Sequence, residues 1–558
     1  MNISQRSQTV YGKYLLAAQS YPDRVLLRYI TDGKEETLTY LQVAPYIASL
    51  VRTLQQQGIK KGNHVVLYLD DIVPSFLFCL AIAHIGAVIV PLPTKYSVTT
   101  LAGLCKRVKP KLIFSALFQK EVLNAAGLKA IYSDDFFTPV IKTSVEGCQK
   151  KVTEYSALQW LGKISTSHHA DDLYMLQPTS GSTGDFKLVM ITHRHITYAA
   201  DIALTFDLCT AKEPAEKILM VAHLSNGMGQ INSITALTLA AELCIPSLID
   251  VKTPLNEVRQ LDPTYLCVTP RILQTLYAQH KMYGDTQLFG TSAKLLTIGG
   301  ASTYPELLDY VNQQGVDIIE CYGATEVALL LATPRGQWRK GYIGKPLPGV
   351  DIKITKDGEL QVRSPSQMIG YYADQEATQS VFSDEGYYCT GDIFEAGEAG
   401  YFRFIGRKKD VFHTLEYSNI YPERIEAIVE GLPGVRQAVL IGDQKPYVTV
   451  LMVIENNYAN ELENGYLDPE QFIGLYKKIG KELKIINETL EPFERIEAFS
   501  LLSKPISSNL YKAVGQSKIR REREKISAHY AALINVMYTN KNHAIESMYA
   551  DFGFEYEG

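Results

Sequence analysis

Short apolar runs alternate with segments of helical period through most of the first 350 residues, and this alternation restricts the fold more than any other feature. A strand-like run at residues 25–30 is followed by residues 39–57, where apolar side chains recur three or four positions apart. Thr39 supplies a side-chain oxygen that can cap the first turn of that helix. Strands that alternate with helices favour parallel sheets with helices on their faces. The sequence therefore predicts an α/β fold.

The same alternation continues toward residue 321. Helices are predicted over residues 9–20 and 75–84. Strands are predicted at residues 65–69, 87–92, 112–114, 128–132, 173–176, 188–191, 219–222, 243–245, 266–268, 295–298 and 318–321. Residues 133–170 are polar and weakly patterned, which predicts a plain connection there.

The pattern changes beyond residue 350. A β-hairpin is predicted over residues 351–363, and short strands at 387–388 and 401–405 indicate a β-rich subdomain. A compact segment follows, with predicted helices at 422–429 and 469–487 and strands at 437–441 and 447–454. We therefore expect a large N-terminal domain over residues 1–407, with parallel sheets and the β-rich subdomain, and a small, mobile α+β C-terminal domain over residues 408–558.

Composition excludes several classes of protein. A net charge of −5 over 558 residues does not favour a nucleic-acid partner. The eight cysteines are scattered without a CxxC pair, which argues against a zinc site or a disulfide framework and favours a cytoplasmic location. The most apolar stretch, residues 75–93, contains His84 and is interrupted at Gly86, so it predicts a buried helix and strand rather than an integral membrane segment.

One short loop is rich in hydroxyls and glycines. Glycines allow backbone N–H groups to turn toward an anion, and Ser, Thr and Lys side chains add donors. The alternative is a polar hairpin turn, and the spacing is not that of a Walker-type P-loop. The residues that form this predicted phosphate loop are Thr179, Ser180, Gly181, Ser182, Thr183, Gly184 and Lys187.

Three further motifs follow predicted strands. The first, Gly299-Gly300-Ala301, has a tight turn as its alternative explanation. The second runs from Tyr322 through Gly323 and Thr325 to Glu326, and such pentads also arise by chance. The third, Thr390-Gly391-Asp392, precedes Arg407, and a lone Gly-Asp pair is usually a turn. Their order along the chain is what gives them weight.

Together these motifs resemble those of the adenylate-forming superfamily, which includes acyl-CoA synthetases, fatty acyl-AMP ligases and adenylation domains. The resemblance extends from Thr39 to about Tyr538, and the loop departs from the family pattern at Phe186 and Leu188. The C-terminal half is most similar to long-chain acyl-CoA synthetases, whereas the loop is similar to fatty acyl-AMP ligases. Glu416-Tyr417 stands where the long-chain branch has two glycines beside the pantetheine tunnel.

The resemblance implies roles for individual residues. The loop and Lys187 hold the β- and γ-phosphates of ATP, and Thr325 supports the α-phosphate. Glu326 holds Mg²⁺, and Lys409 is the hinge about which the small domain rotates. The nucleotide's base and ribose are bound by Gly300, Ala301, Tyr322, Gly323, Asp392 and Arg407.

Two of these residue assignments have alternatives. His223 lies where the family has a residue beside the carboxylate pocket, and Gly227 leaves room for an acyl chain, but a histidine satisfied in the core fits nearly as well. Lys518 matches the family's catalytic lysine, which stabilises charge at the α-phosphate. Lys512 is its rival because the register of that segment is uncertain.

The implied activity is an acid–thiol ligase. A carboxylic acid, with a fatty acid favoured, is activated by Mg-ATP to an acyl-adenylate with release of pyrophosphate, and the acyl group passes to a thiol. CoA is the favoured acceptor. One alternative is loading of the phosphopantetheine of an acyl carrier protein. The other is a binding or scaffold protein that has this fold but impaired chemistry.

Overall fold

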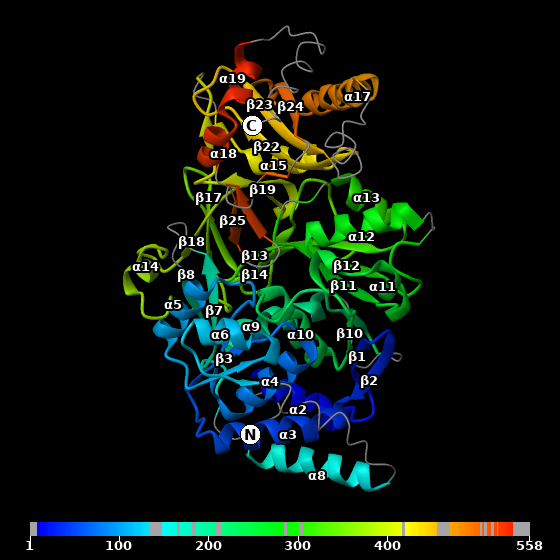
Figure 1. Ribbon diagram of the computed structural model, residues 1–558, viewed down its shortest axis with the longest axis vertical. Coiled ribbons are helices and arrows are strands. Elements are labelled where there is room, and N and C mark those ends of the chain that lie inside the picture. The colour runs from blue at the N-terminus through cyan, green and yellow to red at the C-terminus, as the bar shows by residue number, and fades with distance from the viewer. Residues whose placement is uncertain are drawn as a thin grey trace.

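The computed structural model describes residues 8–132, 148–164, 168–180, 186–206, 215–283, 287–301, 303, 305–415, 419–454, 469–502, 505–506, 511–514, 518–521 and 523–539. Two sheets form the large body in the lower part of Figure 1, and a smaller α+β part stands above them. The α/β class predicted from the alternating pattern is confirmed.

The first sheet is built from β3 (His64–Tyr68), β4 (Val88–Pro91), β5 (Leu112–Ser115), β6 (Ile131–Tyr132), β7 (Leu173–Ser180) and β8 (Phe186–Thr192). Its spatial order is β6-β5-β3-β4-β7-β8. The first five of these are joined by parallel pairing, and β8 returns antiparallel beside β7. The sheet therefore ends in a hairpin that contains the predicted phosphate loop.

The second sheet comprises β1 (Val25–Thr31), β2 (Lys34–Thr39), β9 (Lys217–Leu219), β10 (Glu242–Ile245), β11 (Tyr265–Val268), β12 (Leu295–Gly299), β13 (Asp317–Ala324), β14 (Ala328–Ala332) and β15 (Lys345–Pro346). Its order is β15-β14-β13-β12-β11-β9-β10-β1-β2. Pairing is parallel from β1 through β13 and antiparallel at both ends. β11 lies in the middle, so both of its faces are covered.

Helices cover both faces of each sheet. The largest core joins the inner faces of the two sheets to α2 (Val10–Ser20), α3 (Tyr40–Gln56), α4 (Ile72–Ile85), α9 (His193–Asp201) and α10 (Gly227–Leu239). The outer face of the first sheet packs on α5 (Val98–Val108) and α6 (Lys120–Ala125). That of the second packs on α11 (Leu255–Leu261), α12 (Pro270–Tyr283) and α13 (Pro305–Gln313).

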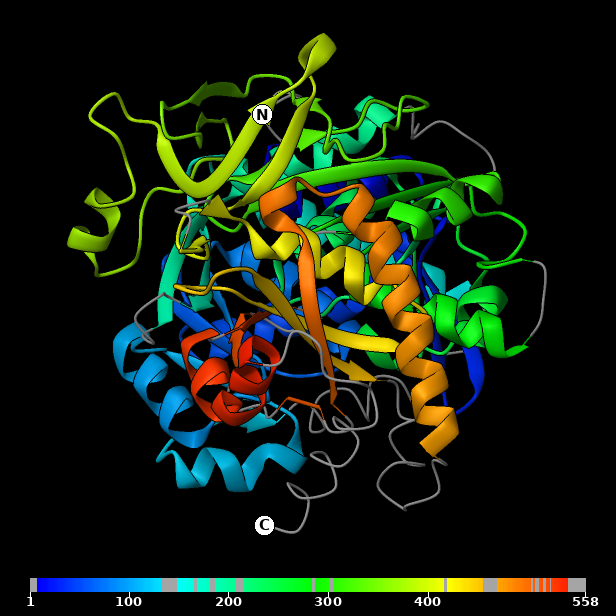
Figure 2. The same cartoon turned by 90° about the horizontal axis from the view of Figure 1, so that it is seen from above.

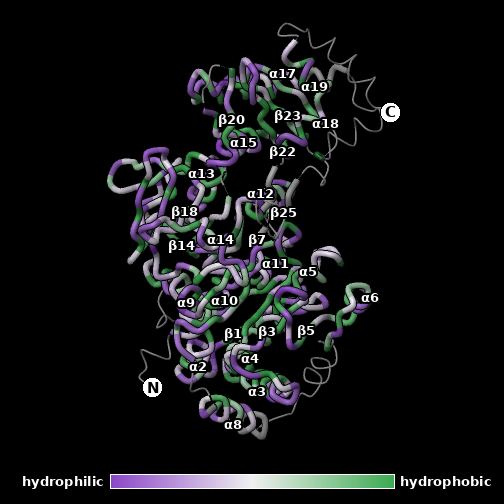
Figure 3. The backbone as a smooth tube through the Cα atoms, turned by 90° about the vertical axis from the view of Figure 1, so that its left-hand side faces the viewer, coloured by the Kyte–Doolittle hydropathy of each residue, from purple (hydrophilic) through white to green (hydrophobic). Residues whose placement is uncertain are grey.

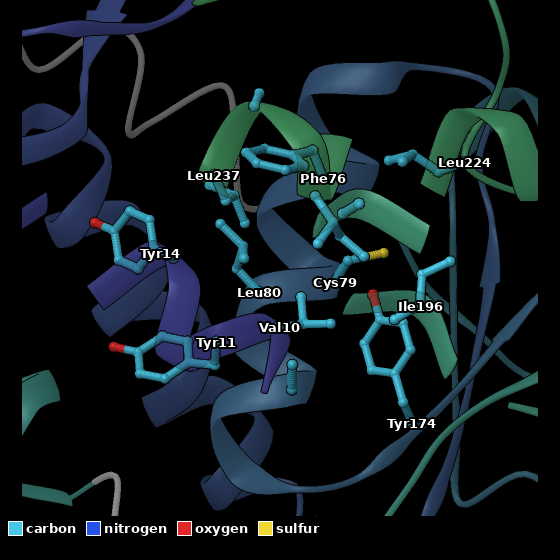
Figure 4. Packing of buried hydrophobic residues seen from close by; sticks show 14 of the residues in the cluster. Val10, Tyr11, Tyr14, Phe76, Cys79, Leu80, Tyr174, Ile196, Leu224 and Leu237 are labelled. Atoms are coloured by element: carbon cyan, nitrogen blue, oxygen red, sulfur yellow. The ribbon is translucent and has the colours of Figure 1, made fainter. Parts of the chain in front are cut away.

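Strand periodicity produces this layering. Along β3, Val65 and Leu67 face the central core, whereas Val66 and Tyr68 face α5 and α6. Figure 3 shows hydrophobic segments concentrated around β1, β3 and β5 inside the large body. Figure 4 shows how side chains of α2, α4 and α10 meet between the sheets, with Leu80 and Leu237 among them.

The most apolar stretch of the sequence forms α4 followed by β4, as predicted. The α4 segment is buried on nearly every side, and its end is marked by Gly86 in the left-handed region at φ 75°. Among the residues that the structure describes, no helix is long and apolar enough to cross a membrane.

Two local predictions near the N-terminus have different outcomes. Thr39 accepts from Gln42 N while the Gln42 side chain accepts from Thr39 N, which is a capping box and confirms the predicted helix start. The plain connection predicted over residues 133–170 is wrong in part, because it contains α8 (Cys148–Ile164). Its Leu158 and Leu161 are buried where α8 packs on α3. Too few apolar residues lie on this face for the periodicity to be evident.

The predicted β-rich subdomain is a four-stranded antiparallel sheet. It contains β16 (Asp351–Ile354), β17 (Glu359–Arg363), β18 (Tyr388–Ala396) and β19 (Phe402–Arg407), and α14 (Gln375–Gln379) lies between β17 and β18 in the chain. The hairpin over residues 351–363 is confirmed. β18 runs well beyond the two residues predicted, since its later part pairs with β19.

A separate core forms after residue 411. Its sheet has the order β22-β23-β24, with β22 (Val435–Ile441), β23 (Val448–Ile454) and β24 (Ile496–Leu502). One face packs on α15 (Pro422–Glu430) and α17 (Pro469–Glu488), and the other on α18 (Arg523–His529) and α19 (Ala531–Thr539), as Figure 2 shows. Two hairpins complete this part: β20 (Phe412–His413) with β21 (Asn419–Ile420), and β25 (Tyr511–Val514) with β26 (Lys518–Arg521).

One carboxylate of the second sheet makes stability depend on pH. Trp338 Nε1 donates a 2.7 Å hydrogen bond to Glu320 Oε2, and burial raises the pKa of Glu320 to about 7. A carboxyl whose pKa is higher in the folded protein than in the unfolded chain stabilises the fold fully below the pKa of the unfolded chain. This stabilisation is lost as the pH rises through 7. We therefore expect the free energy of unfolding to fall by roughly 2–3 kcal/mol from this group between pH 5 and pH 8.

Chemical denaturation across that pH range tests this prediction with E320Q, which should lose most of the decline. The exposed Glu306, which pairs with Lys340, provides the matched control E306Q, whose slope should stay close to wild type. Equal pH slopes for wild type and E320Q would contradict the assignment to Glu320.

Candidate active site

The predicted phosphate loop joins the two antiparallel strands at the end of the first sheet. Thr179 lies opposite Lys187 in the β7–β8 ladder, and Ser180 lies opposite Phe186. The remaining predicted members of the loop lie outside the described residues: Gly181, Ser182, Thr183 and Gly184. The two flanking strands are confirmed, and the phosphate-binding role of the loop stays a prediction.

Packing accounts for both departures of the loop from the family pattern. Leu188 is 0% exposed in the core between the first sheet and α5. The ring centroid of Phe186 lies 4.8 Å from that of Tyr96, and the Phe186 carbonyl accepts from Arg107 Nη1. These side chains stabilise β8, so neither departure requires a loss of chemistry.

Tyr371, which belongs to none of the predicted motifs, connects Lys187 to Glu326. Lys187 Nζ lies 4.6 Å from the centroid of the Tyr371 ring. The Tyr371 hydroxyl donates a 2.9 Å hydrogen bond to Glu326 Oε1. Backbone hydrogen bonds join residues 369–372 to β8, which fixes Tyr371 beside the loop. A cation and a carboxylate predicted from distant motifs are thus brought together by one phenol.

Opposing effects act on the pKa of Glu326. Burial raises the pKa of Glu326, while the hydrogen bond from Tyr371 and the positive charge of Lys187 act to lower it. A cation near this carboxylate would favour its ionised form further. Glu326 is therefore suited to contact a cation.

The motif that begins at Tyr322 lies partly inside β13, so the prediction that it follows the strand is wrong. β13 continues to Ala324 because it pairs with β14 as well as with β12. A Cβ atom at Gly323 would lie 1.8 Å from the Ala328 carbonyl oxygen, so this close approach admits only glycine. Thr325 and Glu326 then occupy the turn between the two strands.

Asp392 links Tyr322 to Arg407. The Tyr322 hydroxyl donates a 2.6 Å hydrogen bond to Asp392 Oδ2, and Arg407 Nε lies 3.4 Å from Asp392 Oδ1. Asp392 and Arg407 face each other across β18 and β19, so Asp392 belongs to a strand rather than to the usual Gly-Asp turn. Burial and the negative charge of Asp392 hold the pKa of Tyr322 well above its usual 10.0, which keeps the phenol a neutral donor.

Arg407 remains charged in this setting. Burial acts to lower the pKa of Arg407, but Asp392 and Glu423 raise it overall. Within the described part of the chain, its buried Nε makes no hydrogen bond. An oxygen of a bound ligand could accept the hydrogen bond that this Nε does not make with Asp392.

Glu359 of β17 stabilises the turn residues next to Asp392. Its Oε1 accepts from Gly391 N at 3.0 Å, and Lys408 Nζ donates to its Oε2 at 3.0 Å. Lys408 also pairs with Asp357 at 2.6 Å. Lys409 is exposed in the turn that follows β19, ahead of the separate C-terminal core. Its role as a hinge stays a prediction.

The small residues after β12 are open to solvent. Gly300 and Ala301 are exposed, and nothing lies within 4 Å of a Cβ built on Gly300. Gly300 also has a φ of +88°, which other residues rarely adopt. A flat ring can therefore approach this backbone.

His223 is buried with one ring nitrogen satisfied. It is 4% exposed, and its Nδ1 accepts from Ser225 N at 3.1 Å. Burial lowers the pKa of His223, whereas the charge of Asp70 and hydrogen bonds to the backbone of Leu69 and Asp70 act to raise it. The place of His223 beside the carboxylate pocket therefore stays a prediction, with a histidine satisfied in the core as its alternative.

Gly227 begins α10 close to His223. A Cβ on Gly227 would have nothing within 4 Å. A Cβ on Gly229, two residues further along the helix, would lie 2.3 Å from the His223 carbonyl oxygen. The start of α10 thus packs closely against the backbone near His223, while Gly227 borders open space.

Both candidate catalytic lysines belong to one hairpin. In the β25–β26 ladder Lys512 pairs with Arg520, and Lys518 pairs with Val514. β25 contacts β7, the strand that leads into the phosphate loop, although the hairpin is part of the C-terminal segment (Figure 1). Residues 518–521 of the basic run therefore form a strand rather than a helix face.

Comparison with protein families gives two matches. The family described as AMP-binding enzyme matches residues 16–372, and the family described as AMP-binding enzyme C-terminal domain matches residues 410–542.

Curated relatives match across most of their length. The medium/long-chain-fatty-acid–[acyl-carrier-protein] ligase FadD10 of Mycobacterium tuberculosis is 25% identical, with 78% of this chain and 82% of the relative covered. The long-chain-fatty-acid–CoA ligase FadD15 of Mycobacterium bovis is 22% identical, with 92% and 95% covered. Among solved structures, ATP-bound MatB from Rhodopseudomonas palustris superposes with a TM-score of 0.70 at 19% identity, covering 93% of this chain and 99% of that one. At that identity the structural likeness concerns the fold.

Proposed function

Because this chain belongs to the AMP-binding enzyme family, we propose that it activates a carboxylic acid with ATP and transfers the acyl group to a thiol. It is an AMP-forming acid–thiol ligase, in keeping with relatives named for acyl-CoA and acyl-carrier-protein ligation. The observation that carries the proposal is the meeting of Lys187, Tyr371 and Glu326 beside the loop between β7 and β8. These three residues place a cation and a carboxylate where the phosphates of ATP are expected.

In the first step, a carboxylate oxygen attacks the α-phosphorus of ATP, and the bond from that phosphorus to the bridging oxygen breaks. Acyl-adenylate forms and pyrophosphate leaves. The chain's own contribution is orientation and charge stabilisation. Lys187 and the loop hold the β- and γ-phosphates, and Thr325 and Lys518 stabilise the α-phosphate.

The nucleoside is held by the Tyr322–Asp392–Arg407 group. Asp392 accepts from the ribose hydroxyls, and Arg407, which is paired with Asp392, contacts ribose or phosphate oxygen. Gly300, Ala301 and Gly323 border the adenine ring, with Tyr322 stacked on it. Pocket residues His223 and Gly227 face the carboxylate and the start of the acyl chain.

A magnesium ion fits the donors present. Among the described residues no three acidic, histidine or cysteine side chains form a metal cluster. Mg²⁺ characteristically uses one or two carboxylates, substrate phosphates and water. Glu326 would hold the ion, which would neutralise charge on the phosphates.

In the second step, a thiol sulfur attacks the acyl carbonyl carbon, the thiol proton passes to solvent and AMP leaves. We favour CoA as the acceptor, because the C-terminal half is most similar to long-chain acyl-CoA synthetases. The alternative is a carrier-protein phosphopantetheine, which the loop and Glu416-Tyr417 favour; residues 416–418 lie outside the described residues. Rotation of the C-terminal domain about Lys409 separates the two steps in this proposal.

We place the protein in the cytoplasm. The six cysteines whose side chains the structure describes are all unpaired, which suits a reducing compartment. The scaffold alternative has no support, because packing of β8 explains Phe186 and Leu188.

Pyrophosphate release from ATP with a panel of fatty and aryl acids, with and without CoA, tests the function. We expect many turnovers with CoA and a fatty acid. Release that stops near one equivalent per enzyme and ignores CoA would favour a carrier-protein acceptor. D392A should be inactive and serves as the control for contaminating activity. No release with any acid, and no thermal protection by Mg-ATP, would contradict the proposal.

A further inference from the structure

β18 does not pair regularly with β17 where the Thr-Gly-Asp motif lies. Glu359 is opposite Ile393, and Gln361 is opposite Cys389, so three residues of β18 face one residue of β17. Residues 390–392 therefore form a bulge in this strand pair. Bulges beside a binding site change the direction of the side chains that they carry.

Side chains replace the strand partners that the bulge removes. Thr390 Oγ1 accepts from Asp392 N at 3.1 Å. Gly391 N donates to Glu359 Oε1 at 3.0 Å, and the Gly391 carbonyl accepts from Lys408 N at 2.9 Å. Because the backbone groups of a strand are normally hydrogen-bonded, Glu359 supplies the acceptor that a regular strand partner would supply.

Glu359 is itself held in place by the turn that precedes β17. Glu359 N donates to Thr355 Oγ1 at 2.9 Å, and Thr355 N donates to Glu359 O at 3.0 Å. The Glu359 side chain is 12% exposed, and Lys408 Nζ donates to its Oε2 at 3.0 Å. This ion pair compensates the charge of the largely buried carboxylate, while the other carboxylate oxygen binds Gly391.

The bulge determines the direction of the Asp392 side chain. Gly391 directly precedes Asp392, and its φ of +70° lies in the left-handed region, so the chain changes direction there. The Tyr322 hydroxyl donates to Asp392 Oδ2 at 2.6 Å, and Arg407 lies opposite Asp392 in the β18–β19 ladder. Without the hydrogen bond to Glu359, the peptide before Asp392 would lose its restraint, and the carboxylate would lose its fixed position between these two partners.

We propose that Glu359 is a positioning residue for nucleotide recognition, which acts through Gly391 to hold the Asp392 carboxylate where the ribose hydroxyls bind. Glu359 itself does not touch the nucleotide. This inference rests on the proposed function, which assigns Asp392 to the ribose. A carboxylate that accepts from both ribose hydroxyls discriminates between ATP and 2′-deoxy-ATP, because the 2′-hydroxyl adds a charge-assisted hydrogen bond.

Pyrophosphate release with ATP or with 2′-deoxy-ATP measures this discrimination, using the acid that wild type activates best. We expect wild type to prefer ATP by roughly ten- to hundredfold in kcat/KM, which is the contribution of one hydrogen bond to a charged group. E359A should reduce the preference to less than about threefold, mainly through a higher KM for ATP. The preference is a ratio measured within one preparation, so a smaller folded fraction of a variant does not change it.

Two further variants separate the hydrogen bond from the charge. E359Q keeps an oxygen that accepts from Gly391 N but loses the ion pair with Lys408, and it should retain most of the wild-type preference for ATP. D357N is the matched control, because Asp357 also pairs with Lys408, at 2.6 Å, but belongs to the turn before β17. It should keep the wild-type preference.

A wild-type preference that persists in E359A would overturn this inference and leave the proposed function intact. Equal losses in E359A and E359Q, or a similar loss in D357N, would assign the effect to charge and overturn it too. Equal use of both nucleotides by wild type would remove the ribose contact that the inference needs, while acid activation would stand. No release with any acid and no protection by Mg-ATP would remove the proposed function, and this inference with it.

Discussion

Replacing Glu326 with glutamine is expected to lower kcat/KM for pyrophosphate release by roughly 10²- to 10³-fold. The amide oxygen introduced by E326Q would still accept the hydrogen bond from Tyr371, so the shape of the site should persist. What is lost is the negative charge that faces Lys187 and the proposed metal ion. Steady-state release at several Mg²⁺ concentrations measures the effect, and the loss should be smaller at the highest concentrations.

Protein stability should move in the opposite direction. Burial raises the folded-state pKa of Glu326, so its contribution to stability is present at low pH and lost as the pH rises through that value. E326Q should therefore be at least as stable as wild type at neutral pH. Y371F is the matched control: it keeps the charge of Glu326, loses the hydroxyl that donates to Glu326 and should cost only about tenfold in kcat/KM. A similar loss in E326Q and Y371F would contradict a charge-based role.

Local signals were sufficient for much of the fold. The alternation of strand and helix periods predicted parallel sheets, and Thr39 marked a helix start, which its capping box with Gln42 confirms. α8 was not identified because its apolar residues are few and its burial depends on α3, which no local pattern reveals. The extensions of β13 and β18 were missed for a related reason. Pairing with β14 and β19 carries both strands through motifs that resemble turns.

For the site, the chain order of motifs predicted which groups would matter but not how they meet. Tyr322, Asp392 and Arg407 come from three separate motifs and form one hydrogen-bonded and ion-paired group. Tyr371 carries no motif of its own. Its importance arises from backbone pairing of residues 369–372 with β8, a contact between segments about 180 residues apart in the chain. Long-range pairing of this kind has no sequence signature in a single chain.

Replacing Lys518 with alanine should separate the two half-reactions. The family-like role of this lysine is to stabilise charge at the α-phosphate during adenylation. We expect K518A to slow pyrophosphate release by roughly 10²- to 10³-fold. Transfer from added acyl-adenylate to the thiol should change by less than about fivefold, because that step does not build charge at the α-phosphate in the same way. Rapid-quench measurement of each half-reaction tests both expectations.

K512A is the matched control, because Lys512 lies on the partner strand of the same hairpin. Its adenylation rate should stay within about threefold of wild type, as expected for a lysine that does not reach the reacting atoms. The opposite result, with K512A inactive and K518A active, would assign the catalytic role to Lys512.

The hairpin itself is anchored independently of both lysines. Arg523, just after β26, binds Glu426 of α15 through both carboxylate oxygens, and Glu426 is 0% exposed. Because this ion pair holds the end of the hairpin in both variants, a difference between their adenylation rates reports on the lysine side chains and not on the position of the hairpin beside β7.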